Sequence, residues 1–132
     1  MRILFLLPFI FSSTILLADE WLLLHHNNGE NLYIHSTSIQ SIEGNFSIRN
    51  AIDKLERNDG KDISLFDGVK SVLTHNQFDC KNKLHRVISI RLELQNNKQR
   101  EVHNKALEWK KIPNNSTAEL EWQKVCSVSI KK

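Results

Sequence analysis

Hydrophobic and polar residues alternate along the chain from Glu20 onward, and this pattern predicts a series of short β-strands. Glu20–His26 and Asn31–His35 flank Asn28-Gly29, a dipeptide that is typical of two-residue type I′ hairpin turns. The cross-strand partners set by such a turn are Leu24 with Tyr33, Leu23 with Ile34, and Leu22 with His35. The face expected to be buried carries Trp21, Leu23, His25, Leu32 and Ile34.

Two further strands are predicted before the first cysteine. The apolar residues of Phe46–Glu56 alternate, but several of them also fit a helical stripe. We favour a strand there, because the segment follows a turn at Glu43-Gly44-Asn45. Asn58–Lys61 predicts the next turn. Val69–Cys80 then predicts a strand that leads into the first cysteine.

Leu84–Leu94 shows the most regular alternation in the chain. Its predicted apolar face carries Ile88, Ile90, Leu92 and Leu94, and its polar face carries Ser89, Arg91 and Glu93. Arg100–Trp109 can return beside this strand. A strict two-residue turn at Asn96-Asn97 would set Leu92 against the charged Glu101, so we expect a longer loop and leave the register open.

The hydrophobic period changes to a helical one near the C-terminus. Pro113 ends the sheet, and Ser116 to Glu119 forms a capping box, in which the two terminal side chains bond free backbone N–H groups. The apolar face of the predicted helix carries Ala118, Trp122, Val125 and Cys126. The predicted fold class is therefore α+β, an antiparallel sheet covered by one C-terminal helix.

Residues 1–18 have the layout of a signal peptide. Arg2 precedes an apolar run, and Ala18 precedes the charged pair Asp19-Glu20. The run is too short and too interrupted to match a membrane span of about 20 apolar residues, although an uncleaved anchor is the alternative. We expect cleavage to leave residues 19–132 as a single exported domain without a stable membrane span. Its destination is the periplasm, the cell surface or the medium.

Cys80 and Cys126 are the two cysteines of the 132-residue chain. An exported protein reaches a compartment where disulfides persist, and the helix would direct Cys126 toward the sheet, where Cys80 can meet it. We therefore predict a disulfide, with two buried free thiols as the alternative. No Cys-x-x-Cys motif is present, so the expected role of the bridge is structural.

Composition narrows the classes of function. The formal net charge is +3, and the charged residues are interspersed as on an ordinary solvated surface. A nucleic-acid-binding protein would carry a basic stripe, so we expect no nucleic-acid partner. The sequence also has no Gly-x-Ser-x-Gly motif and no glycine-rich phosphate loop. We expect a protein that is not an enzyme and that uses no cofactor.

The titratable residues do not predict a metal or acid–base site. His25 and His26 are neighbours on a strand and so point to opposite faces. His26 and His35 share a face but lie too far apart for one zinc ion. Two pairs of carboxylates lie close together in the sequence, Asp53 with Glu56 and Glu119 with Glu121. We interpret them as turn, cap and surface residues and not as an acid–base site. We therefore predict neither catalytic nor metal-binding residues.

The three tryptophans differ in their predicted surroundings. Trp21 and Trp122 lie on faces that are expected to be buried, which favours roles in the core. Trp109 ends a polar strand and is as well suited to binding a partner as to packing in the core.

The order of several short motifs is informative as a whole. A tryptophan near the mature start is followed by Gly-x-x-x-Tyr-Ile, by Gln-Phe-Asp-Cys-Lys, by Trp-x-x-Ile-Pro and by a last cysteine. Here these motifs are Trp21, Gly29 to Ile34, Gln77 to Lys81, Trp109 to Pro113, and Cys126. This order, which spans nearly the whole mature chain, resembles the surface-adhesin protein E family of small exported bacterial proteins.

The resemblance implies an antiparallel sheet with a C-terminal helix tethered by the disulfide, and binding rather than catalysis. The implied partners are host matrix or serum proteins such as vitronectin, laminin and plasminogen, and a homodimer is a further expectation. The implied binding stretch is Val69–Val87, whose positive charges beyond Cys80 could steer an acidic segment of a partner. The proposed partner-binding residues are Lys81, Lys83, His85, Arg86 and Trp109.

Two alternatives stay open from the sequence. Val69–Val87 can also be a polar turn between two strands, with no binding role. The protein can also be a periplasmic envelope protein that binds another bacterial component or inhibits a hydrolase.

Overall fold

The structure is a computed structural model that describes residues 20–130. The predicted leader, residues 1–18, lies outside the described residues. The elements are β1 (Trp21–Asn27), β2 (Glu30–His35), the 3-10 helix η1 (Ser36–Ser38), β3 (Gln40–Ile42), β4 (Asn45–Arg57), β5 (Val69–Asp79), β6 (Leu84–Leu94), β7 (Gln99–His103), β8 (Lys110–Lys111) and α1 (Thr117–Ser127).

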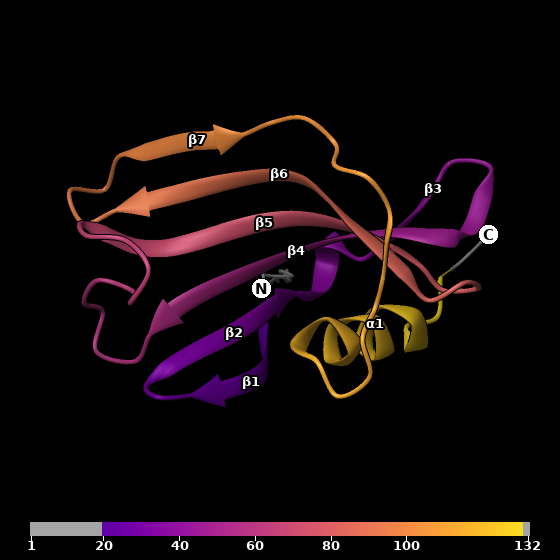
Figure 1. Ribbon diagram of the computed structural model, residues 1–132, viewed down its shortest axis with the longest axis horizontal. Coiled ribbons are helices and arrows are strands. Elements are labelled where there is room, and N and C mark those ends of the chain that lie inside the picture. The colour runs from indigo at the N-terminus through magenta and orange to yellow at the C-terminus, as the bar shows by residue number, and fades with distance from the viewer. Residues whose placement is uncertain (1–19, 131–132) are drawn as a thin grey trace, which may run out of the picture.

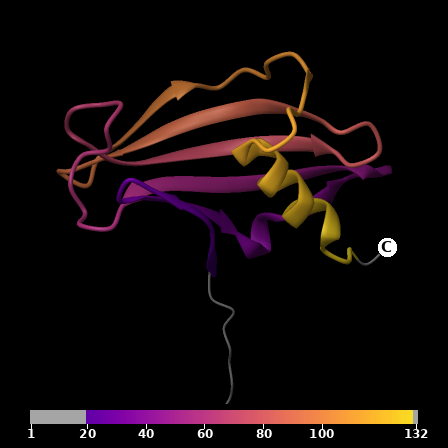
Figure 2. The same ribbon diagram turned by 60° about the horizontal axis from the view of Figure 1, so that its bottom comes forward.

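The eight strands of the described residues form one antiparallel sheet. Its order is β1-β2-β4-β5-β6-β7, with β3 beside β4 and β8 beside β6. Helix α1 crosses one face of this sheet near the turn between β5 and β6, and it does not extend to the other end of that face (Figures 1 and 2). The predicted α+β class is confirmed. Among the described residues, no helix is long and apolar enough to cross a membrane.

The strands follow the alternation in the sequence. The ambiguous segment is a strand, β4, as predicted, and β5 and β6 occupy the expected positions. The β6–β7 loop is longer than two residues: the N–H of Leu94 donates to the carbonyl of Lys98, which leaves three residues between them. Farther along, Ile90 lies opposite His103.

The predicted pairing of the first hairpin is wrong at its open end. The turn forms as expected, with Asn28 and Gly29 both at positive φ. A β-bulge between Leu23 and His25 then shifts the register, so Leu23 rather than Leu24 lies opposite Tyr33. Between the bulge and the start of β1, the side chains that face the core are therefore the ones that the sequence predicted to face solvent.

The predicted buried face of that hairpin is correspondingly wrong in part. Ile34 is fully buried, but Leu23 is 56% exposed, and Leu22 and Leu24 pack against the core instead. Trp21 does not join the core cluster. Its ring packs edge-on against His35 and lies under the ammonium group of Lys54.

Two hydrophobic clusters hold the sheet and helix together. The larger cluster lies under α1 and consists of Ile34, Ile39, Ala51, Phe78, Ile112 and Val125, with Trp122 packed against it. The smaller cluster lies at the other end of the sheet and consists of Ile63, Val69 and Leu92. Burying these side chains contributes roughly 25 cal/mol per Å² of apolar surface removed from water.

Both ends of α1 are fixed by side chains. The Ser116 hydroxyl accepts a hydrogen bond from the N–H of Glu119, as the capping box predicts, while the Glu119 carboxylate accepts from the N–H of Asn115. At the other end, Arg49 of β4 donates to the carbonyls of Val125 and Val128 at 2.8 and 2.6 Å. A cation at this end also complements the helix dipole.

Candidate functional site

The disulfide predicted between Cys80 and Cys126 is present, and it ties α1 to the end of β5. The turn that follows Cys80 is ordered by Asp79, whose carboxylate accepts from the backbone N–H groups of Lys81 and Asn82. The indole N–H of Trp122 donates to the Asp79 carbonyl at 3.1 Å. Helix, turn and strand are therefore joined at one point, within the implied binding stretch Val69–Val87.

Two of the predicted partner-binding residues are engaged inside the protein. Lys83 forms an ion pair with Glu119 and a hydrogen bond with Asn114. The His85 ring stacks on Phe78. Burial and the nearby charge of Lys110 both lower the pKa of His85, which keeps its ring neutral at pH 7. Neither side chain offers a free positive charge to a partner.

Arg86 and Trp109 form a stacked pair at the edge of the sheet. The Arg86 guanidinium carbon lies 4.6 Å from the centroid of the indole ring, and its Nε donates to Gln77 at 2.8 Å. The residues after Trp109 pair with β6, which places Lys110 opposite His85 and Lys111 opposite Leu84. Both lysines are exposed, as is Lys81 in the preceding turn.

We call the set Lys81, Arg86, Trp109 and Lys111 the Arg86–Trp109 surface. Arg86 follows His85 on β6, so their side chains point to opposite faces. His85 points to the face that carries α1, because it lines a cavity there with Thr117 and Glu121. The Arg86 side chain therefore lies on the other face, which α1 does not cover.

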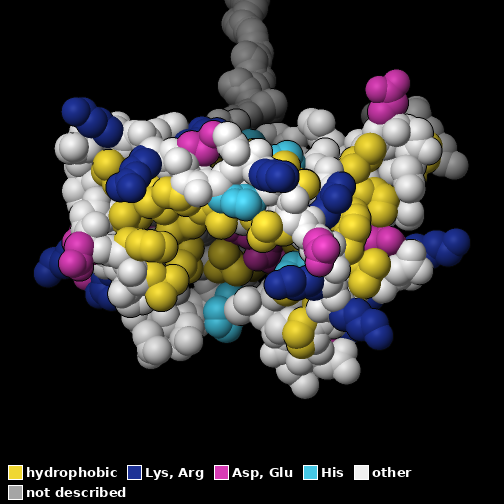
Figure 3. Space-filling view, turned by 45° about the horizontal axis from the view of Figure 1, so that its top comes forward, with side chains coloured by type: hydrophobic (Ala, Val, Ile, Leu, Met, Phe, Trp, Pro, Cys, Tyr) yellow, Lys and Arg dark blue, Asp and Glu magenta, His cyan; other side chains and the backbone are white. Residues whose placement is uncertain are grey.

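A second candidate site lies on the helix-bearing face, which sequence reasoning did not identify. A cavity of about 440 Å³ opens between the β1–β2 hairpin, β4 and the start of α1. Figure 3 shows the hollow, with acidic side chains at its floor, histidines at its rim and hydrophobic side chains to one side. Its lining residues are His25, Asn27, Asn28, Glu30, Leu32, Leu55, Arg57, Ser64, Thr117 and Glu121.

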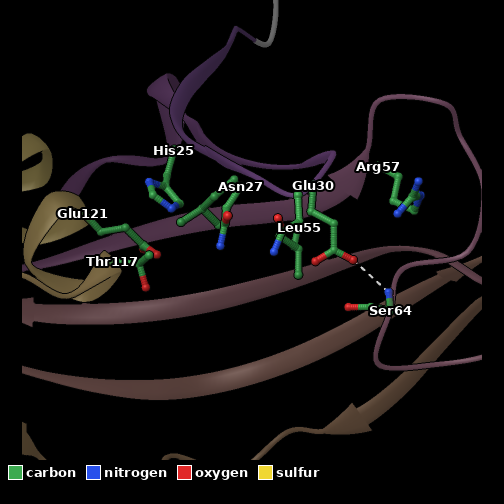
Figure 4. Close-up of a pocket in the computed structure, with 10 residues that line it drawn as sticks. His25, Asn27, Glu30, Leu55, Arg57, Ser64, Thr117 and Glu121 are labelled. Carbon is green, nitrogen blue, oxygen red and sulfur yellow. Dashed lines mark hydrogen bonds between the residues drawn. The ribbon is translucent and has the colours of Figure 1, made fainter.

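The cavity has two polar ends, with Asn27 and Leu55 between them (Figure 4). His25, Thr117 and Glu121 lie together at one end, and Glu30, Arg57 and Ser64 lie at the other (Figure 4). The Glu30 carboxylate accepts a hydrogen bond of 2.8 Å from the N–H of Ser64. Leu32 and Leu55 contribute the apolar wall between the two ends. A smaller cavity of about 190 Å³ adjoins the first one and shares Thr117 and Glu121 with it.

A buried pair of carboxyl groups, Asp53 and Glu121, lies where the two cavities meet: Asp53 lines the smaller cavity, and Glu121 lines both. The prediction that these residues are exposed is wrong, because each is only 7% exposed. They share a hydrogen bond, and Asn76 donates a second one to Asp53 at 2.8 Å. Oε2 of Glu121 is buried, and the described residues place no hydrogen-bond donor beside it.

Burial shifts the protonation of this pair. Desolvation raises the pKa of Asp53 to about 6, against the lowering effect of its hydrogen bonds. Desolvation and the neighbouring Asp53 raise the pKa of Glu121 well above its usual range. When the pair holds a single proton, Glu121 therefore carries it and donates it to Asp53. In the part of the chain that the structure describes, no three His, Cys, Asp or Glu side chains gather to hold a metal ion.

The chain is similar in sequence pattern to one protein family and in fold to solved structures. A family model described as surface-adhesin protein E matches residues 21–127. A structure of Haemophilus influenzae protein E aligns with a TM-score of 0.62 and 14% identity, covering 89% of this chain and 91% of that chain. A second crystal form aligns with a TM-score of 0.58 and 16% identity, covering 86% of this chain and 97% of that one. No match is found among curated protein sequences.

Proposed function

This chain belongs to the surface-adhesin protein E family, and on that premise we propose that it is an exported, non-enzymatic protein that captures a host matrix or serum protein. The family supports a surface protein of the adhesin type, and the fold is that of protein E. The proposal adds the class of partner, the absence of catalysis and the surface that binds.

The stacked pair of Arg86 and Trp109 is the observation that carries the proposal. Tryptophan and arginine are the residue types most enriched among those that dominate the energy of protein–protein interfaces. Trp109 is only half-buried in the described structure, and Arg86 holds its ring in one orientation. A pre-ordered aromatic side chain binds with a smaller loss of conformational entropy than a mobile one.

Nearby lysines give the same surface a positive charge. Lys81 and Lys111 are exposed at the same end of β6 as Arg86. Exposed charges of one sign accelerate encounters with an acidic segment of a partner, and salt weakens this effect. We therefore expect a partner whose binding region is acidic.

The test measures binding of residues 19–132 to immobilised vitronectin, laminin and plasminogen at low and high salt. The variants are Trp109→Ala and Arg86→Gln, and the matched control is Arg100→Gln, which removes the same charge from the exposed edge strand β7. Thermal melting of each variant checks that the fold is retained.

The proposal predicts salt-sensitive binding to at least one of these proteins. Trp109→Ala should weaken that binding by roughly tenfold or more, and Arg86→Gln should weaken it too. Arg100→Gln should bind as the wild type does. Binding that is equal in all three variants would contradict the assigned surface, and binding to none of the three host proteins would contradict the proposed class of partner.

A further inference from the structure

Glu121, which lines the large cavity, has a buried carboxyl oxygen for which the described residues supply no hydrogen-bond donor. Glu121 is more than nine-tenths buried, this oxygen is its Oε2, and its side chain lines both the larger and the smaller cavity. A buried acceptor without a donor is unfavourable, because it has lost its hydrogen bonds to water. A ligand that supplies a donor to this oxygen would restore a hydrogen bond.

The surroundings of Glu121 define what such a donor can be. The polar groups around Glu121 are His25 on β1, Asp53 on β4, Thr74 and Asn76 on β5, His85 on β6 and Thr117 on α1. Asp53 is the acidic member of this set. The pKa of His85 is lowered, so its ring is neutral at pH 7 and does not supply a competing positive charge. The local chemistry favours a cation over an anion.

We propose that this cavity binds a primary aliphatic amine, with the ammonium group at the Asp53–Glu121 pair and the alkyl chain along Leu32 and Leu55. An ammonium group carries three donors and no acceptor, so it can satisfy Glu121 Oε2 and replace the proton that the pair now shares. A divalent metal ion would need more than two protein ligands, and the described residues offer no such group.

The shape and size of the cavity fit the alkyl part of this ligand. About 440 Å³ lies within the range of small-molecule sites, and Leu32 and Leu55 line it with apolar surface. At the far end, Arg57 is already bonded to Asp59. The site lies on the face opposite Arg86, so this inference does not rest on the proposed host-protein surface and can fail or succeed separately.

The same ammonium group can come from two sources, a free alkylamine or a lysine side chain of a protein. The probes are therefore pentylamine and a capped lysine, Nα-acetyl-lysine-N-methylamide. Pentan-1-ol and the capped norleucine serve as uncharged controls of matched length. Binding is measured by calorimetry and by the carboxyl ¹³C shifts of Asp53 and Glu121, at pH about 5 and about 8.

The variants are Glu121→Gln and Asp53→Asn, with the exposed Glu43→Gln as a charge-matched control. We expect pentylamine to bind the wild type and Glu43→Gln with the same affinity. Binding should be tighter at the higher pH, because fewer protons then compete with the ammonium group for the carboxyl pair. Glu121→Gln should weaken binding roughly 10- to 100-fold. Asp53→Asn, which keeps the shape of the pair, provides a second test if Glu121→Gln does not fold.

Each outcome decides the proposal. Binding of pentylamine alone supports a free amine as the ligand, and binding of the capped lysine as well supports a lysine side chain. Equal binding of the uncharged controls, undiminished binding in Glu121→Gln, or no binding of either amine at millimolar concentration would overturn it.

Discussion

The ammonium nitrogen of Lys83 lies 2.5 Å from the Glu119 carboxylate, so the turn after β5 is held to the first turn of α1. The same ion pair lowers the pKa of Glu119. Lys83 belongs to the stretch that the family resemblance implies for partner binding, yet its contacts are internal. It therefore offers a way to separate a structural role from a binding role within one stretch.

Replacing Lys83 with methionine should lower the melting temperature by a few degrees and leave host-protein binding unchanged. The alkyl stem is kept, but the ion pair and the hydrogen bond to Asn114 are lost. Calorimetric melting and the binding assay on the same sample test this. Lys98→Met, in the exposed β6–β7 turn, is the control for loss of one charge. Loss of host-protein binding without loss of stability would show that Lys83 contacts the partner.

Removing the disulfide by Cys80→Ser with Cys126→Ser should destabilise the fold strongly. The bridge closes a loop with a sequence separation of 46, for which the chain-entropy model gives about 4 kcal/mol. A domain of this size should then melt roughly 10 °C lower or more. The measurement is a melting curve of the double variant beside the wild type with and without a reductant. Coincident curves would show that the bridge does not contribute to stability.

The β-bulge in β1 predicts that substituting two adjacent leucines destabilises the fold to different extents. Leu24→Ala should cost about 1–2 kcal/mol, because Leu24 packs against the core and is partly buried. Leu23→Ala should cost less than about 0.5 kcal/mol, because Leu23 is 56% exposed. Urea unfolding of both variants measures the difference. A larger loss of stability in Leu23→Ala than in Leu24→Ala would contradict the bulge and favour the register predicted from the sequence.

The first hairpin shows what alternation along a sequence can and cannot predict. Asn28-Gly29 fixes the turn, and Leu32 and Ile34 then alternate as expected. Position 24 carries no residue that marks a bulge, because leucine suits either face of the strand. A single inserted residue therefore reversed the predicted orientation of the residues beyond it, Leu23 among them.

The buried acid pair was missed because each residue was interpreted by its charge and not by its position. Asp53 alternates with the inward-facing Ala51, and Glu121 lies one helical turn before Val125. Those two spacings could have placed both carboxyl groups on buried faces. Nothing in the sequence shows that the two faces meet, because that depends on where α1 crosses the sheet.

The Asp53–Glu121 pair should make stability fall as the pH rises. Both pKa values are raised in the folded state, to about 6 for Asp53, so the folded protein holds protons that the unfolded chain releases above about pH 4. This contribution is present at low pH and is lost as the pH rises through 6. The lowered pKa values of His75 and His85 act in the opposite direction.

A comparison of the wild type with Glu121→Gln separates these effects, because the histidines are common to both proteins. The melting temperature of the wild type relative to that of the variant should decrease between pH about 5 and about 8. Glu43→Gln should show the same pH profile as the wild type. A constant difference across this range would show that the pair does not exchange a proton there.

We propose that the protein acts outside the cell, as an adhesin-like surface protein that captures a host protein. Protease treatment of intact cells followed by immunoblotting tests this location, with a known periplasmic protein as the internal control. This protein should be degraded while the control survives. Protection of both proteins until the outer membrane is opened would exclude a surface location and favour a partner within the cell envelope.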